Sequence, residues 1–293
     1  MSFTGEVKEE LSKIPNLAKK EEVIHELIGY FISNNFVEEK NLFKYSTESE
    51  YNINRYAKIL RNVNIEDFKI DVQSKVYYIT FKKKELKEDK VKNLIEEINN
   101  FDKCESLDFI NLKAVLRGAF LGSGSINNPE NNYHLEIGLK SEFYIDKIIN
   151  LVNKTKEVDI KLKEMEGKIY IKNSEEISKF LALIGATKAM LKFEDIRVQR
   201  EMSNKVNRLV NCKAANLNKT LNASINQVEA IRKLKQNGKF NKLPNSLKEI
   251  AELRLEYPDM SLVDLGKKLK EPLGKSGVNY RLKKIEKLGE EYE

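Results

Sequence analysis

The sequence predicts an α+β protein, in which a duplicated domain of mixed helices and strands is followed by an all-helical domain. Three observations lead to this prediction. Helical and strand periodicities alternate in the same order twice between residues 20 and 185. The excess of positive charge lies in the last third of the chain, and capping residues, proline and glycine divide that third into short helices.

The first half-repeat covers residues 20–99. Its expected elements are helices near 20–34, 49–62 and 85–99 and strands near 40–46, 64–72 and 75–82. Lys82, Lys83 and Lys84 close the last strand. They could contact a nucleic-acid backbone, although a solvated strand end is the commoner role of such a run.

The second half-repeat covers residues 110–185 and follows the same order. Its expected elements are helices near 110–122, 142–155 and 174–184 and strands near 132–139, 158–164 and 168–173. The expected pattern of each pass is αββαββα, in which only one strand of the first pair is located here, and each pass opens with a glycine-bearing helix. Gly29 and Gly118 are about 90 residues apart, which is too long for a solenoid repeat and typical of a duplicated half-domain. We assign residues 1–191 to this domain.

Small residues recur at matching places in the two opening helices. They are Gly29 and Ser33 in the first helix and Gly118 and Gly122 in the second. Small residues four apart form a flat strip, which lets two helices approach closely at a pseudo-twofold axis. Such contact would offset the propensity cost of about 1 kcal/mol for each helical glycine. Two unrelated core helices are the alternative, and the matching element order of the two passes opposes it.

The two segments LIGYFISNN (27–35) and LRGAFLGSG (116–124) resemble the paired LAGLIDADG motifs of homing endonucleases. In active members the eighth position of each motif is an acid, and the two carboxylates hold divalent metals for phosphodiester hydrolysis. Here these positions are Asn34 and Ser123, which lack the negative charge that hard cations need. Glu38, Glu39 and Glu130 fall beyond the helix ends as solvated turn charges. We therefore expect no catalytic residue, no metal site and no nuclease activity.

The last third of the chain carries the net positive charge. The number of Lys and Arg residues less the number of Asp and Glu residues gives a net charge of 30 − 31 = −1 for residues 1–191. For residues 192–293 it is 22 − 14 = +8. This asymmetry suggests a nucleic-acid-binding module, and a lysine-rich solvated surface is the alternative. Residues 192–212 are expected to form a helical linker. Residues 213–293 are then the DNA-binding domain, opening with one helix over 216–237 or with a pair broken near Asn222.

Three short helices are expected at the end of the chain, near 247–256, 262–269 and 275–288, with Pro272 and Gly274 in the last turn. Val278, Leu282 and Ile285 would form the buried stripe of the third helix. The pattern is that of a helix-turn-helix with a basic recognition helix. We expect Ser276, Asn279 and Tyr280 to reach base edges. The expected phosphate contacts come from the cations of the last two helices: Lys267, Lys268, Lys275, Arg281, Lys283 and Lys284.

The amino-acid sequence of this region resembles that of the WhiA family. The resemblance rests on LPNSLKEIAELRLEYPDMSLVDLGKKLKEPLGKSGVNYRLKKIEKL (243–288), on FLGSGSINNPENNYHLEI (120–137) and on the start MSFTGEVKEEL. It implies a degenerate LAGLIDADG domain fused to a helix-turn-helix related to sigma-factor region 4. It further implies a DNA-binding transcription regulator of cell division and chromosome segregation, linked to sporulation in some lineages. The implied partners are double-stranded DNA and other transcription or division proteins.

The sequence argues against several other classes of protein. No apolar run approaches the roughly 20 residues of a membrane span, and the start lacks a signal peptide, so a cytoplasmic, nucleoid-associated location is expected. Cys104, Cys212, His25 and His134 form no ligand cluster, and there is no phosphate-binding glycine loop. We expect no cofactor and no small-molecule substrate. An active LAGLIDADG-type endonuclease or nickase remains the first alternative, and a protein-binding scaffold the second.

Overall fold

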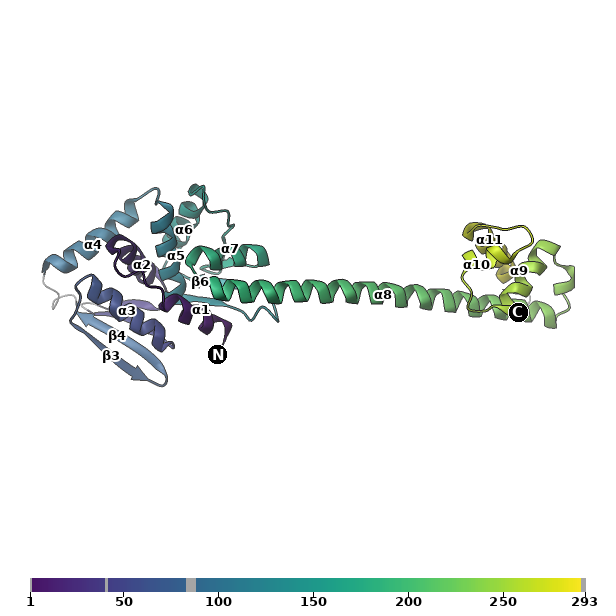
Figure 1. The fold of residues 1–293 in the computed structure, drawn as a ribbon, viewed down its shortest axis with the longest axis horizontal. Coiled ribbons are helices and arrows are strands. Elements are labelled where there is room, and N and C mark those ends of the chain that lie inside the picture. The colour runs from purple at the N-terminus through teal and green to yellow at the C-terminus, as the bar shows by residue number, and fades with distance from the viewer. Residues whose placement is uncertain (1, 40–41, 83–87, 291–293) are drawn as a thin grey trace. The chain divides into compact units, whose positions relative to one another are not determined.

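The computed structural model describes residues 2–39, 42–82 and 88–290, with the side chains of residues 88–95 left out. The chain divides into two compact units, residues 1–201 and 202–293. Unit 1 contains both helices and strands, and the described part of unit 2 is helical (Figure 1). The α+β class and the duplicated first domain are thus as the sequence predicts.

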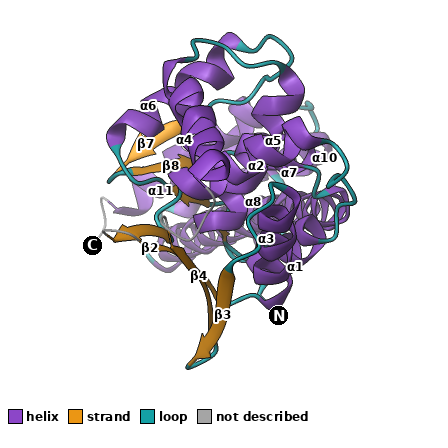
Figure 2. Cartoon of the chain, turned by 90° about the vertical axis from the view of Figure 1, so that its left-hand side faces the viewer, coloured by secondary structure: helices purple, strands orange, loops and turns teal. Residues whose placement is uncertain are grey.

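The first half of unit 1 forms an antiparallel sheet in the order β1-β2-β4-β3 (Figure 2). The strand predicted near 40–46 is the second of two strands here, because β1 precedes it and was not predicted. The first of these has only four residues, of which Phe36 alone is buried, so its period of two is too short to recognise. The elements are α2 (Lys20–Ile32), β1 (Phe36–Glu39), β2 (Leu42–Thr47), α3 (Glu50–Asn62), β3 (Phe68–Gln73), β4 (Val76–Lys82) and α4 (Glu88–Lys103).

The second half repeats this topology with the strand order β5-β6-β8-β7. The strand predicted near 158–164 begins later, because buried Ile160 lies in the connection before it rather than in the sheet. The elements are α5 (Phe109–Ser123), β5 (Gly124–Ile126), β6 (Leu135–Gly138), α6 (Glu142–Lys154), β7 (Lys163–Met165), β8 (Lys168–Ile171) and α7 (Ser174–Ile184).

A helix not expected from the sequence precedes the duplication. This helix, α1 (Phe3–Ser12), buries Phe3, Val7 and Leu11, which recur every four residues and so lie on one face. The hydroxyl of Thr4 donates a hydrogen bond to the carbonyl of Ile126 at 2.7 Å, which ties α1 to β5. The N-terminal segment therefore belongs to the core of unit 1.

One helix, α8 (Thr187–Gln236), runs from unit 1 into unit 2 and includes the whole predicted linker. It is unbroken at Asn222, because its fifty residues contain neither proline nor glycine. Gly185 (φ 96°) and Gly238 (φ 68°) adopt the left-handed conformation just outside its two ends. Phe193 packs into the core of unit 1, and Ile231 and Leu234 pack into that of unit 2.

Unit 2 closes on a small core formed by the end of α8 and the helices that follow it. These are α9 (Asn245–Glu256), α10 (Leu262–Lys268) and α11 (Lys275–Glu290), preceded by a 3-10 turn at Phe240–Lys242. Leu247, Ile250, Leu265, Leu282 and Ile285 are among its buried side chains. None of the described helices in either unit combines the length and the apolar composition that a bilayer crossing requires.

Candidate nucleic-acid interface

The buried stripe of α11 decides which side chains of this helix face solvent. Val278, Leu282 and Ile285 are all completely buried, as predicted from their spacing. Because a helix turns 100° per residue, the opposite side carries Ser276 and Tyr280. Tyr280 is 68% exposed, the most of any large hydrophobic residue among the described residues of unit 2. Lys283, Lys284 and Lys287 are exposed on the same side. The structure thus gathers a tyrosine, a serine and three ammonium groups on one surface.

Two of the predicted site residues lie at the edge of this surface. Asn279 is half-buried, and together with Lys275 it lines a cavity of about 270 Å³ bounded by α8 and α10. Ser261, the residue that caps the start of α10, lines the same cavity. Lys275 itself is exposed at the first position of α11.

The remaining predicted cations have partners within unit 2. Arg281 donates from Nη1 to the carbonyl of Ser246 at 3.4 Å, which turns its guanidinium toward α9. Lys267 forms an ion pair with Asp264 at 2.8 Å. This hydrogen bond, helped by one from Ser261, lowers the pKa of the Asp264 carboxyl. Lys268 lies over the ring of Tyr257, 4.3 Å from its centre. Of the six predicted phosphate contacts, Lys275, Lys283 and Lys284 have no such partner among the described residues.

The turn between α10 and α11 depends on Gly266. A Cβ atom at this position would lie 2.0 Å from the carbonyl oxygen of Leu273, whose own N–H donates back to the Gly266 carbonyl at 3.1 Å. Only glycine allows this approach. The side chain of Ser261 caps the start of α10 by accepting from the N–H of Asp264. The two short helices are therefore held at a fixed spacing.

Arg254, which the sequence analysis did not single out, holds the connection between α9 and α10. It is 1% exposed and donates from Nη1 to the carbonyls of Pro258 (3.0 Å) and Met260 (2.8 Å). The signal was present in the sequence, because Arg254 continues the apolar spacing of Leu247 and Ile250 along α9. A charged residue at such a place is buried only with partners.

The two glycine-bearing helices of unit 1 pack backbone against backbone. A Cβ on Gly118 would lie 1.9 Å from the carbonyl oxygen of Glu26, and one on Gly29 would lie 2.2 Å from that of Val115. A Cβ on Gly122 would meet the hydroxyl of Ser33 at 2.3 Å. All four small residues thus lie in the contact between α2 and α5.

The residues at the eighth motif positions bond to a shared carbonyl. The backbone N–H of Asn34 donates to the oxygen of Gly138 at 3.2 Å, and the hydroxyl of Ser123 donates to the same oxygen. Asn35 donates from Nδ2 to the carbonyl of Gly122 at 2.8 Å. The end of the helix pair is therefore filled by neutral donors and backbone acceptors, a set that does not attract a hard divalent cation.

The other candidates of the sequence analysis lie apart. In the described part of the chain, no three His, Cys, Asp or Glu side chains gather as metal ligands would. His25 bonds to the carbonyl of Glu21, and His134 lies 3.4 Å from the carboxylate of Glu136. Glu38, Glu39 and Glu130 are exposed, Cys104 and Cys212 are free thiols, and Lys82 is exposed at the end of β4. Lys83 and Lys84 lie outside the described residues.

A buried ion network, also missed in the sequence, joins the two halves of unit 1. The carboxylate of Glu26 is completely buried and accepts from Arg55 Nη2 at 2.8 Å and from Arg117 Nη1 at 3.2 Å. Arg55 further donates to the carbonyl of Ile14, and Arg117 to that of Ile184. Glu26 and Arg117 are neighbours of the close contact at Gly118. The network therefore fixes the helix pair in its register.

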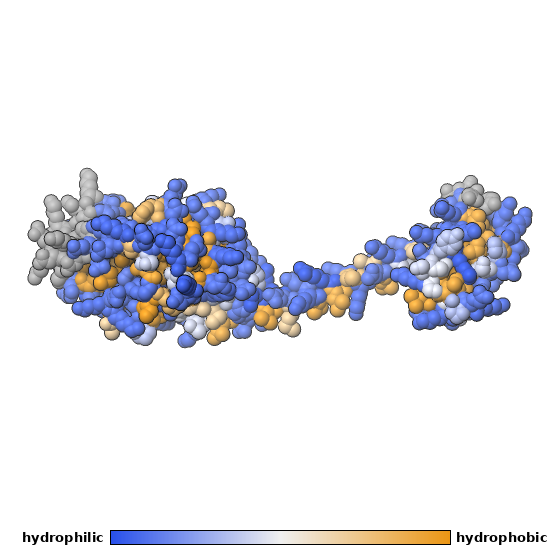
Figure 3. Space-filling model, turned by 90° about the horizontal axis from the view of Figure 1, so that it is seen from above, coloured by the Kyte–Doolittle hydropathy of each residue, from blue (hydrophilic) through white to orange (hydrophobic). Residues whose placement is uncertain are grey.

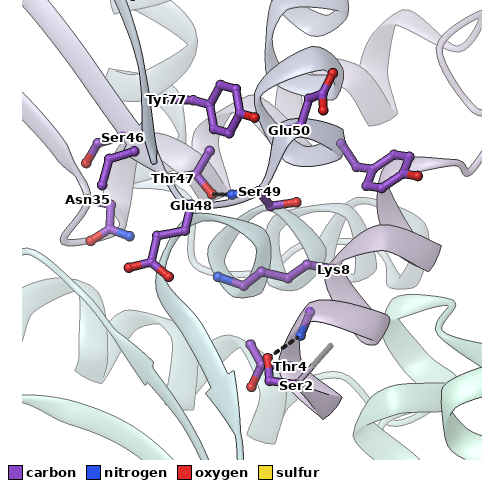
Figure 4. A pocket seen from close by; sticks show the side chains of 13 residues that line it. Ser2, Thr4, Lys8, Asn35, Ser46, Thr47, Glu48, Ser49, Glu50 and Tyr77 are labelled. Carbon is purple, nitrogen blue, oxygen red and sulfur yellow. Dashed lines mark hydrogen bonds between the residues drawn. The ribbon is translucent and has the colours of Figure 1, made fainter. Parts of the chain in front are cut away.

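A cavity of about 600 Å³ opens between α1 and the turn after β2 (Figure 4). Its labelled side chains are mostly hydroxyls and acids, with Lys8 pointing in from α1 and Glu48 facing it. Burial lowers the pKa of Lys8 to about 8, and the charge of Glu48 offsets part of this shift. Neither histidine nor cysteine lines this cavity.

Comparison with known proteins identifies relatives of both units. Residues 112–203 match the family model of the WhiA LAGLIDADG-like domain, and residues 206–289 match that of the WhiA C-terminal HTH domain. A probable cell division protein WhiA of Clostridium tetani is 37% identical over 320 aligned positions, which cover 99% of this chain and 98% of that protein. One of Clostridium beijerinckii is 50% identical over 181 positions, covering 61% of this chain and 57% of its own.

A solved structure is similar over the whole chain. The full-length DUF199/WhiA of Thermatoga maritima superposes with a TM-score of 0.59 at 29% sequence identity. The superposition covers 100% of this chain and 99% of that chain.

Proposed function

The chain belongs to the WhiA family, and on that premise we propose that it is a DNA-binding transcription regulator without nuclease activity. In this proposal α11 enters the major groove of double-stranded DNA, and the regulated processes are cell division and chromosome segregation, with sporulation in some lineages. The protein acts in the cytoplasm, at the nucleoid. The duplicated domain serves as a second surface for DNA or for other transcription and division proteins.

One observation carries the proposal: α11 presents Ser276, Tyr280 and exposed lysines opposite its buried stripe, in a domain that matches a helix-turn-helix model. The N-terminal residues of a recognition helix reach base edges, and lysines beside them contact phosphates. Ser276, Asn279 and Tyr280 are then the readers, with Asn279 able to pair bidentately with adenine. Lys275, Lys283 and Lys284 hold phosphates, with Arg281, Lys267 and Lys268 as supporting cations.

The test distinguishes residues that contact base edges from residues that contact phosphates. Asn279→Ala should cost about 1–3 kcal/mol on a specific site and little on scrambled DNA. Lys284→Ala should weaken both equally and lower the salt slope by about one. Lys242→Ala, which removes an exposed lysine outside α11, is the control. The measurement is an anisotropy titration at several salt concentrations, on a site obtained by genome-wide footprinting. Equal losses on both DNAs for Asn279→Ala and Lys284→Ala would show that α11 reads no sequence.

The absence of nuclease activity has its own test. Asn34 and Ser123 supply no carboxylate, so supercoiled plasmid incubated with Mg²⁺ or Mn²⁺ should remain uncut and unnicked. Cleavage that follows the protein through purification and is abolished by EDTA would contradict this part of the proposal.

A further inference from the structure

The middle of α8 has a composition unlike the rest of the chain. Residues 202–228 contain no Asp or Glu, seven asparagines and four cations, which are Lys205, Arg208, Lys213 and Lys219. Every residue from 201 to 220 is exposed. This stretch of helix therefore presents a positively charged, amide-rich surface that is exposed along its length.

The asparagines are not scattered around the helix. Six of them follow spacings of 3, 4, 7, 4 and 4 residues, which place them on one side of an α-helix. They are Asn204, Asn207, Asn211, Asn218, Asn222 and Asn226, and we call this side the asparagine face. Arg208 and Lys219 are eleven residues, or three turns, apart and flank it on one edge. Lys213 points to the other side.

That other side is apolar. Met202, Val206, Leu209, Val210 and Leu217 are each 56–63% exposed on it. Figure 3 shows the two characters of the helix, with hydrophilic residues along one edge of α8 and hydrophobic ones along the other. Six of the seven asparagines and two of the four cations thus lie on one face of the helix or at its edge.

Helix stability does not explain this composition. Asparagine is less favourable than alanine in a helix interior by about 0.6 kcal/mol, so seven of them cost roughly 4 kcal/mol. A solvated helix usually recovers such a cost through i,i+4 ion pairs, but residues 202–228 contain no acid to form them. The composition of residues 202–228 therefore lowers helix stability and leaves a row of neutral hydrogen-bonding side chains between the cations.

The chemistry of this row matches double-stranded DNA. Asparagine amides pair with adenine edges and with phosphate oxygens, and Arg and Lys neutralise phosphates. The absence of acids removes repulsion from the phosphate backbone. The asparagine face from residue 204 to 226 is about 33 Å long, close to the roughly 34–36 Å of one helical turn of DNA. We propose that this face is a second duplex-DNA contact, an inference that rests on the proposed function of α11.

The test uses the full-length chain and a 40-base-pair random-sequence duplex, titrated by fluorescence anisotropy at several salt concentrations. Arg208→Gln and Lys219→Gln should each lower the salt slope by about 0.9, which corresponds to roughly eightfold weaker binding at 0.1 M salt. Lys213→Gln removes the same charge from the other side of the same segment. It should change the affinity less than twofold, which makes it the matched control.

A second pair of variants excludes a loss of helix as the cause. Asn211→Ala together with Asn218→Ala should weaken binding although alanine favours the helix, and far-UV circular dichroism should show undiminished helicity. Hydrogen exchange should show protection of backbone amides 204–222 when the duplex is added, because an uncovered helix exchanges freely.

The outcomes distinguish this inference from the proposal for α11. If Lys213→Gln weakens binding as much as Arg208→Gln, the asparagine face is not the contact and the inference is wrong. The inference also fails if no α8 variant has an effect while Lys284→Ala does, and the function of α11 then stands. If the parent protein binds no duplex at all, both are wrong.

Discussion

Replacing Gly118 by alanine should separate the two central helices of unit 1. The added Cβ would lie 1.9 Å from the carbonyl oxygen of Glu26, whereas ordinary van der Waals contact begins near 3.4 Å. The helices must therefore move apart by about 1.5 Å at this point, because neither backbone can rotate away as a side chain would. The same movement stretches the 3.2 Å contact between Arg117 and Glu26.

The magnitude follows from two opposing effects. Overpacking a well-packed core costs about 1–3 kcal/mol and occasionally more, and the backbone clash places this case at the upper end. Alanine recovers about 1 kcal/mol through its better helix propensity. We expect the free energy of unfolding to fall by about 2 kcal/mol or more. Asn150→Ala in α6 is the control within unit 1, because this exposed position gains helix propensity without a new close contact.

Urea denaturation followed by near-ultraviolet circular dichroism of tyrosine measures the effect. Nine of the twelve tyrosines precede residue 202, and the chain has no tryptophan, so this signal reports mainly on unit 1. An unchanged or raised midpoint for Gly118→Ala would refute the close packing of the pair. If that variant does not fold, Gly122→Ala with and without Ser33→Gly replaces it, because removing the Ser33 hydroxyl 2.3 Å from the new Cβ should restore stability.

Two further predictions concern buried charges. Glu26→Ala leaves two buried arginines without their carboxylate, so it should destabilise unit 1 by about 3–5 kcal/mol, measured by the same denaturation; a loss below 1 kcal/mol would contradict the network. Lys8 has a pKa near 8 in the folded chain and an ordinary value of 10.5, so between these pH values the unfolded chain binds more protons. The unfolding free energy should therefore rise from pH 8 to 10.5. Lys8→Met should remove that rise and increase stability at pH 7, and identical pH profiles for variant and parent would show that Lys8 is not desolvated.

Helical periodicity predicts those elements of the fold that bury one long face. The helices expected near 49–62, 142–155 and 174–184 correspond to α3, α6 and α7 within one residue at either end. The short strand β1 was not predicted and β7 was misplaced. The alternation of buried and exposed residues along a strand needs several repeats to be recognised. The continuity of α8 was left open, since Asn222 has a poor helix propensity and only the lack of proline and glycine favours one helix.

The positions of the candidate residues were predictable where they depend on a single helix and unpredictable where they depend on a neighbouring element. The rotation of α11 follows from its own apolar spacing. The bond from Arg281 to Ser246 and the position of Lys268 over Tyr257 arise from tertiary packing that no local pattern contains. Glu26 and Arg254 were overlooked for a related reason, because a periodicity argument treats every charged residue as facing solvent.

The carbonyl of Gly138, which accepts from the backbone N–H of Asn34 and from the hydroxyl of Ser123, favours a neutral donor over an acid at position 123. An aspartate at position 123 would set a carboxylate oxygen against that carbonyl, two acceptors with no proton between them. An acid at position 34 alone would find no partner across the helix pair with which to share a metal. A pair of carboxylates at this end would therefore need changes at both positions and at the strand end beside Gly138. The contact at one backbone carbonyl thus limits which side chains this end of the helix pair can accept.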